Sequence, residues 1–129
     1  MSTHAIVVFI DNEYNEKYTK EKPYAKAYVH YDGYPKYFGK QLKNFLDNIT
    51  IRSSIRPGDE IYKSAVGMGC LVAQFFSKFK TDIGNIYYLH PDEDNCHVSY
   101  IYYVTINENS NINITVKNSR NNEISLENQ

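Results

Sequence analysis

Runs of apolar residues and apolar–polar alternation predict the strands of this chain. Residues 4–10 are almost continuously apolar, which is typical of a buried strand. Residues 24–31, 98–106 and 112–117 alternate apolar and polar side chains, as strands with one buried face do. A short apolar run at 86–89 predicts one more strand. We therefore expect an antiparallel sheet of about five strands, its last two joined by a polar turn.

Two segments between these strands carry apolar residues at helical spacing instead. The first begins near Pro35 and runs to about Ile49, and the second runs from about Gly67 to Lys80. A turn containing Pro57-Gly58 separates them. The apolar positions that define the two helices are Phe38, Leu42, Phe45, Leu46 and Ile49, then Met68, Leu71, Val72, Phe75, Phe76 and Phe79.

Together these elements predict an α+β fold, in which two helices pack on one face of the antiparallel sheet. The chain of 129 residues is the size of one domain, so we expect a single domain over residues 1–129. Residues 118–129 are polar and rich in asparagine, which predicts either a tail or an edge element.

The sequence YDGYP, residues 31–35, joins the second strand to the first helix. Gly33 tolerates a positive φ in a tight turn, and Pro35 suits the first turn of a helix. On local grounds this is an ordinary strand–turn–helix corner. Asp32 and Tyr34 have no evident backbone role in it, so they are candidates for function.

Composition and charge limit the classes of partner. The formal net charge is −1, which gives no reason to expect duplex nucleic acid or an anionic membrane as partner. The sequence has no apolar run of membrane-spanning length and no signal-type start, so we expect a cytoplasmic protein with Cys70 and Cys96 as reduced thiols. The 13 tyrosines suit either interfaces and base stacking or ordinary strand surfaces.

Catalytic and metal-binding patterns are weak. Residues 90–97 hold histidine, carboxylate and cysteine side chains, but their spacing matches no standard ligand set, so we interpret the segment as a solvated acidic loop. Cys70 lies in an apolar stretch and is more typical of a core thiol than of a nucleophile. No motif for a hydrolase, a nucleotide triphosphatase or a dinucleotide enzyme is present. We expect a protein that is not an enzyme and has no cofactor.

The start of the second helix allows an anion-binding interpretation. Backbone N–H groups of Gly67, Met68 and Gly69 lie where the helix dipole favours a phosphate, and Arg56 precedes them in the chain. The alternative is that both glycines only let the helix approach the sheet closely.

Five segments carry a family resemblance: MST at 1–3, YDGYP at 31–35, FGKQL at 38–42, GMGCLVAQF at 67–75 and YIYYV at 100–104. In this order they resemble a widespread family of small phage and prophage proteins. The chain further resembles the Thoeris anti-defence proteins, which counter a bacterial TIR-domain immune system. That resemblance implies a homo-oligomer that binds a cyclic ADP-ribose isomer, or another cyclic oligonucleotide signal, and sequesters it without cleavage.

The candidate ligand residues are Asp32, Tyr34, Arg56, Gly67, Met68, Gly69, Gln74, Asn95 and Arg120. In this set the two arginines are possible phosphate partners. Two other functions remain open from the sequence. One is a nucleotide phosphodiesterase that uses His30 or His90 with Asp32, and the other is an inhibitor whose tyrosine-rich face docks on a host protein.

Overall fold

A six-stranded sheet forms the centre of the molecule. The computed structural model describes residues 3–12, 18–95 and 97–126. In spatial order the strands are β5 (Ile86–Leu89), β2 (Ala25–Val29), β1 (Ala5–Asp11), β6 (Tyr100–Ile106), β7 (Ile112–Asn118) and β8 (Glu123–Ile124). The central pair β1 and β6 is parallel, and every other neighbouring pair in this sheet is antiparallel.

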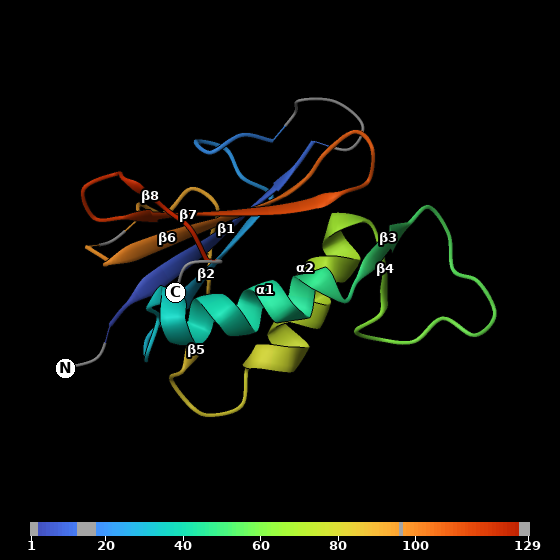
Figure 1. The fold of residues 1–129 in the computed structure, drawn as a ribbon, viewed down its shortest axis with the longest axis horizontal. Coiled ribbons are helices and arrows are strands. Elements are labelled where there is room, and N and C mark those ends of the chain that lie inside the picture. The colour runs from blue at the N-terminus through green and yellow to red at the C-terminus, as the bar shows by residue number, and fades with distance from the viewer. Residues whose placement is uncertain (1–2, 13–17, 96, 127–129) are drawn as a thin grey trace.

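The α+β class predicted from the sequence is confirmed, with a largely antiparallel sheet and two α-helices (Figure 1). The sheet has one strand more than the expected five, because β8 forms within the polar segment 118–129. Leu126 follows it and is buried. The described part of this segment is thus an edge element rather than a tail.

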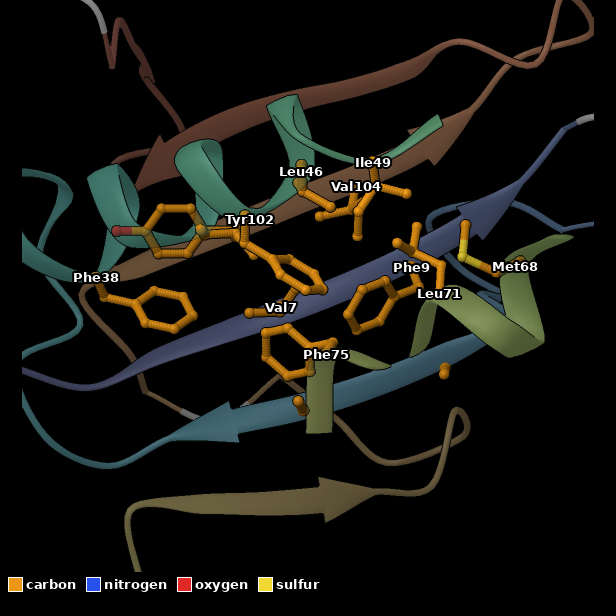
Figure 2. Close-up of a cluster of buried hydrophobic side chains, with 14 of the residues drawn as sticks. Val7, Phe9, Phe38, Leu46, Ile49, Met68, Leu71, Phe75, Tyr102 and Val104 are labelled. Atoms are coloured by element: carbon orange, nitrogen blue, oxygen red, sulfur yellow. The ribbon is translucent and has the colours of Figure 1, made fainter. Parts of the chain in front are cut away.

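Two helices cover one face of the sheet (Figure 1). The first is α1 (Lys40–Asp47), which continues from a wide turn, η1 (Pro35–Gly39), and the second is α2 (Gly67–Phe79). Every second residue of the central strands points toward the helices and supplies the opposite side of this core, as the alternation predicts. Examples are Val7, Phe9, Ala27 and Val104. Figure 2 shows Phe9 and Leu71 close to Phe75, and the Phe9 and Phe75 rings meet edge-on at 5.2 Å. No helix in the described residues is long and apolar enough to cross a membrane.

The other face of the sheet carries a smaller core. It consists of Ile6, Val8 and Ile10, which pack against partly buried residues that include Tyr28, Ile101 and Tyr103. Apolar cover on both faces explains why β1 is almost continuously apolar.

A small excursion between the helices was not foreseen. The chain after α1 forms β3 (Thr50–Arg52), which pairs in parallel with β4 (Ser64–Val66), and the intervening loop projects from the body of the molecule (Figure 1). The predicted turn that contains Pro57-Gly58 lies in this loop. Strands of three residues are too short to show a period in sequence, although Ile51 and Ala65 are both buried.

The corner at 31–35 differs from the expected turn. The left-handed backbone conformation belongs to Asp32, with φ of 53°, and not to Gly33. Aspartate adopts this region more readily than most residues because its short polar side chain can bond locally. Gly33 is required for close approach, since a Cβ there would lie 2.7 Å from the Cβ of Ala5. The expectations of a positive φ at Gly33 and of no backbone role for Asp32 were therefore wrong.

Hydrogen bonds fix the corner to the core. The Gly33 N–H donates to the Thr3 carbonyl at 2.8 Å, and the buried Tyr102 hydroxyl donates to the Gly33 carbonyl at 2.7 Å. Burial raises the pKa of the Tyr102 phenol well above its ordinary value, so the donor stays protonated. Pro35 is the first residue of η1, which confirms its predicted place in the first turn.

Candidate functional site

A cleft of about 750 Å³ opens beside the 31–35 corner. Its walls come from the corner itself, η1, α1, the C-terminal end of α2 and the loop 80–85 that leads into β5. The lining residues are Val29, Tyr31, Asp32, Tyr37, Phe38, Gln41, Asn44, Phe45, Asn48, Tyr62, Lys78, Phe79, Thr81, Asp82, Asn85 and Ile86.

Aromatic rings form much of this cleft. Phe38 and Phe45 belong to the core, and the partly buried Phe79 packs edge-on against both, with its centroid 5.4 Å from that of Phe38 and 5.5 Å from that of Phe45. Tyr31 and Tyr37 are both about half exposed and lie at the cleft's border. The cleft thus has a rigid apolar base and accessible rings on which a flat ligand can stack.

One side of α1 contributes three amides. Gln41, Asn44 and Asn48 are spaced by three and four residues, so they lie along one helix face. The Asn48 amide donates to the Asn44 carbonyl at 2.9 Å. Within the described part of the chain, the side-chain amides of Gln41 and Asn44 have no hydrogen bond. Both can donate to and accept from a ligand.

The loop side of the cleft is held by Asn85. Its amide donates to the Phe79 carbonyl at 2.8 Å and to the Thr81 hydroxyl at 3.2 Å, and its oxygen accepts from the Asp82 N–H at 3.4 Å. Asn85 therefore closes the end of α2 and shapes the loop. The Asn85 side chain therefore has a structural role.

Charge in the cleft is mixed. Lys78 is its one cation among the lining residues, and its Nζ lies 5.5 Å from the centroid of the Tyr62 ring. The Tyr62 ring is held in turn by a 2.9 Å hydrogen bond between its hydroxyl and that of Ser77. Asp32 and Asp82 contribute two carboxylates. This lining suits the flat and polar parts of a ligand better than a cluster of phosphates.

Of the nine candidate residues from the sequence, the cleft includes Asp32 alone. Tyr34, two residues further along the chain, is exposed, and its ring centroid lies 6.1 Å from that of Tyr37. Gly67 has a φ of +79°, which explains the glycine. A Cβ on Gly69 would lie 2.6 Å from the Tyr24 hydroxyl, so the close-approach interpretation fits this position. Met68 is buried in the core.

The other four candidates have structural roles or lie on separate loops. Gln74 is only 9% exposed and donates to the Ser64 carbonyl at 2.9 Å. Asn95 accepts from the buried Lys26 Nζ at 2.8 Å. Arg56 and Arg120 are exposed, and their hydrogen bonds in the described chain involve the backbone. The Arg56 N–H donates to the Asp59 carboxylate and its carbonyl accepts from the Asp59 N–H, while the Arg120 N–H donates to the Asn118 side chain.

Among the described residues of the acidic segment 90–97, no three histidine or carboxylate side chains converge. His90 Nδ1 lies 3.6 Å from an Asp92 oxygen. Cys96, the thiol of this segment, lies outside the described residues. Cys70 has a free thiol.

Most of the residues that line the cleft were not predicted from the sequence. The apolar positions of the cleft were assigned to the core, and the amides of Gln41, Asn44 and Asn48 were not among the candidate ligand residues. Their spacing was a usable signal, but an exposed amide on a helix is common. What distinguishes these amides is the α2 end and loop opposite them, which only the tertiary fold supplies.

Comparison of the chain with family models, with curated proteins and with solved structures gave no match.

Proposed function

We propose that this protein binds a nucleotide-type ligand in the cleft and holds it without cleaving it. The observation that carries the proposal is one site that combines accessible aromatic rings with unpaired amides. Its volume falls within the roughly 300–1,000 Å³ that is usual for small-molecule sites. A purine or pyrimidine offers both a flat face and a hydrogen-bonding edge, so it matches this combination.

The charges favour recognition through the base and sugar rather than through phosphate. Gln41 and Asn44 can pair with the base edge, while Tyr37 or Tyr31 takes the face. Lys78 then neutralises phosphate at the cleft border. Asp32 and Asp82 would repel further negative charge, which limits how deeply phosphates enter.

In its biological role, the protein sequesters a cyclic nucleotide immune signal for a phage or prophage, inside the bacterial host. The resemblance in the 31–35 corner and in the segment 67–75 supports this part of the proposal. The cleft adds chemical support, because a signal such as a cyclic ADP-ribose isomer carries a base and two riboses. Sequestration requires a slow off-rate, so the bound signal should strongly raise the melting temperature.

The test is calorimetric titration with cyclic ADP-ribose isomers, cyclic dinucleotides, AMP and adenosine. Saturation of a tight site followed by heat release of intact ligand supports sequestration. Release of a cleaved product would instead indicate an enzyme. No heat and no melting shift with any of the four ligand classes would overturn the proposal.

Substitutions test whether the ligand binds in the cleft. Tyr37→Ala removes a stacking surface and is expected to weaken binding by about tenfold or more, since base stacking contributes roughly 1–3 kcal/mol. Asn44→Ala is expected to weaken it by a similar factor. Asn109→Ala, a matched change in the distant β6–β7 turn, should leave affinity unchanged. Equal effects of Asn44→Ala and Asn109→Ala would move the site elsewhere.

A further inference from the structure

The sheet has two edges, and they differ in how well they are protected. β8, at one edge, has only two residues, and one of them is Glu123. β5, at the other edge, reads Ile-Tyr-Tyr-Leu and contains no charge, no proline and no glycine. Exposed edges are usually blunted by such residues, because unpaired backbone groups invite another strand. β5 lacks this protection.

Both tyrosines of β5 present surface that nothing in the described chain covers fully. Tyr87 is 48% exposed and Tyr88 is 63% exposed. They point to opposite faces of the sheet: the Tyr87 ring packs 5.8 Å from that of Tyr28, and the Tyr88 ring lies 6.3 Å from that of Phe76. A strand added at this edge would cover apolar surface on both faces.

The free backbone groups of β5 can be assigned. The His30 N–H donates to the Asn85 carbonyl at 2.9 Å, so these two residues form a hydrogen-bonded pair in the β2–β5 register. Because such pairs alternate in an antiparallel ladder, Tyr87 and Leu89 also direct their N–H and carbonyl groups toward β2. Ile86 and Tyr88 then direct theirs outward.

We infer that a second copy of this chain pairs with β5 along this edge, antiparallel and about a two-fold axis. The charges flanking β5 favour this occupant. Two lysines and one carboxylate precede the strand, whereas three carboxylates follow it. They are Lys78, Lys80 and Asp82 before β5 and Asp92, Glu93 and Asp94 after it, and all six are exposed. Antiparallel pairing of two copies places the lysines of each beside the acidic segment of the other, twice.

The free groups also select the register. When Tyr87 lies opposite Tyr87 of the second copy, Ile86 pairs with Tyr88 in both directions, which uses every outward group of β5. A shift of the register toward the C-terminus would need the His90 carbonyl, which already accepts from the Glu93 N–H at 2.9 Å. A shift toward the N-terminus would need Gly84, whose φ of +81° is outside strand geometry. The two sheets then join into one, and Tyr88 of each copy covers the Ile86 end of its neighbour.

The inference does not depend on the ligand proposal, and sedimentation tests it directly. The wild-type protein should sediment at about twice the 15.0 kDa of one chain at micromolar concentration. Tyr88→Pro removes an outward N–H without touching the β2 ladder, and it eliminates two of four intermolecular hydrogen bonds. We expect the dissociation constant of the dimer to rise by about tenfold or more. Tyr88→Lys should also weaken the dimer, because it places a positive charge from each copy in the interface. Ile55→Lys, at an 83% exposed residue of the β3–β4 loop, is the control and should stay dimeric.

Cysteine cross-linking tests the register. In a chain with Cys70→Ser and Cys96→Ser, Tyr87→Cys should oxidise to a covalent dimer, because facing residues of a non-hydrogen-bonded pair lie about 4.5 Å apart. Tyr88→Cys should cross-link poorly, since the two copies of that residue are offset. A wild-type protein that stays at 15.0 kDa up to about 200 µM, or cross-linking at residue 88 instead of 87, would overturn the inference.

Discussion

The hydrogen bond from Tyr102 to the Gly33 carbonyl offers a sharp test of how the corner is held. Tyr102→Phe keeps the buried ring, whose centroid lies 5.3 Å from that of Phe38, and removes only the hydroxyl. The 2.7 Å bond is lost, and the Gly33 carbonyl remains buried without this donor. Leaving a buried acceptor unpaired costs about 1–3 kcal/mol, so we expect a loss near 2 kcal/mol. For a domain of this size that lowers the melting temperature by roughly 6–10 °C.

Urea unfolding followed by circular dichroism measures this loss. Tyr103→Phe is the matched control, because it is the same change on the same strand, and the Tyr103 hydroxyl has no hydrogen bond in the described part of the chain. Its free energy of unfolding should change by no more than about 0.5 kcal/mol. Similar losses in both variants would refute the role given to the Tyr102–Gly33 bond.

The same side chain gives a pH dependence with a defined sign. The pKa of Tyr102 is raised in the folded protein, chiefly by burial. The folded state therefore keeps a proton that the unfolded chain releases above about pH 10. The stability from Tyr102 is complete below that pH and is lost as pH rises above it, by up to about 1.4 kcal/mol per pH unit. The stability gap between wild type and Tyr102→Phe should narrow above pH 10. A gap that is constant to pH 11 would contradict this account.

Three further changes test other contacts. Gly33→Ala forces its Cβ against Ala5 and should lower the free energy of unfolding in urea by about 1–3 kcal/mol. A wild-type value would show that the corner can move away from Ala5 at no cost. Asp32→Gly should be at least as stable as wild type, whereas Asp32→Ala should lose about 1 kcal/mol, because only glycine takes the left-handed conformation freely; equal stabilities would exclude the backbone role of Asp32. Lys26→Met removes the bonds from Lys26 Nζ to the Glu93 carbonyl at 2.6 Å and to Asn95, so proteolysis within residues 92–95 should accelerate, while unchanged cleavage would show that Lys26 does not hold this loop.

Strands and helices that bury one apolar face were predicted correctly from the sequence. The alternation of Ala25, Ala27 and Val29 placed all three in the main core, as did the helical spacing of Leu71 and Phe75. Such positions repeat with the period of the backbone, so local pattern is enough to assign them. The parallel pairing of β1 with β6 joins residues about a hundred positions apart, and no local period carries that information.

Polar residues were harder to assign, because the same side chain can serve a ligand or the fold. Gln74 and Asn95 resembled ligand groups in sequence, yet one bonds the Ser64 carbonyl and the other the buried Lys26. The difference lies in which partner the tertiary structure brings within hydrogen-bond distance. Gln41 and Asn44 lack such a partner in the described chain, and this makes them the stronger ligand candidates.

The 31–35 corner combines residues that support the fold with residues that line the cleft. Asp32 takes a strained left-handed conformation, and strain persists only where surrounding contacts over-determine it. Those contacts come from the next residue, since Gly33 is bonded through both its N–H and its carbonyl and packs against Ala5. The core thus fixes the backbone on which Tyr31 and Asp32 enter the cleft. A cleft supported in this way keeps its geometry without a ligand, and such preorganisation would lower the entropic cost of the binding that we propose.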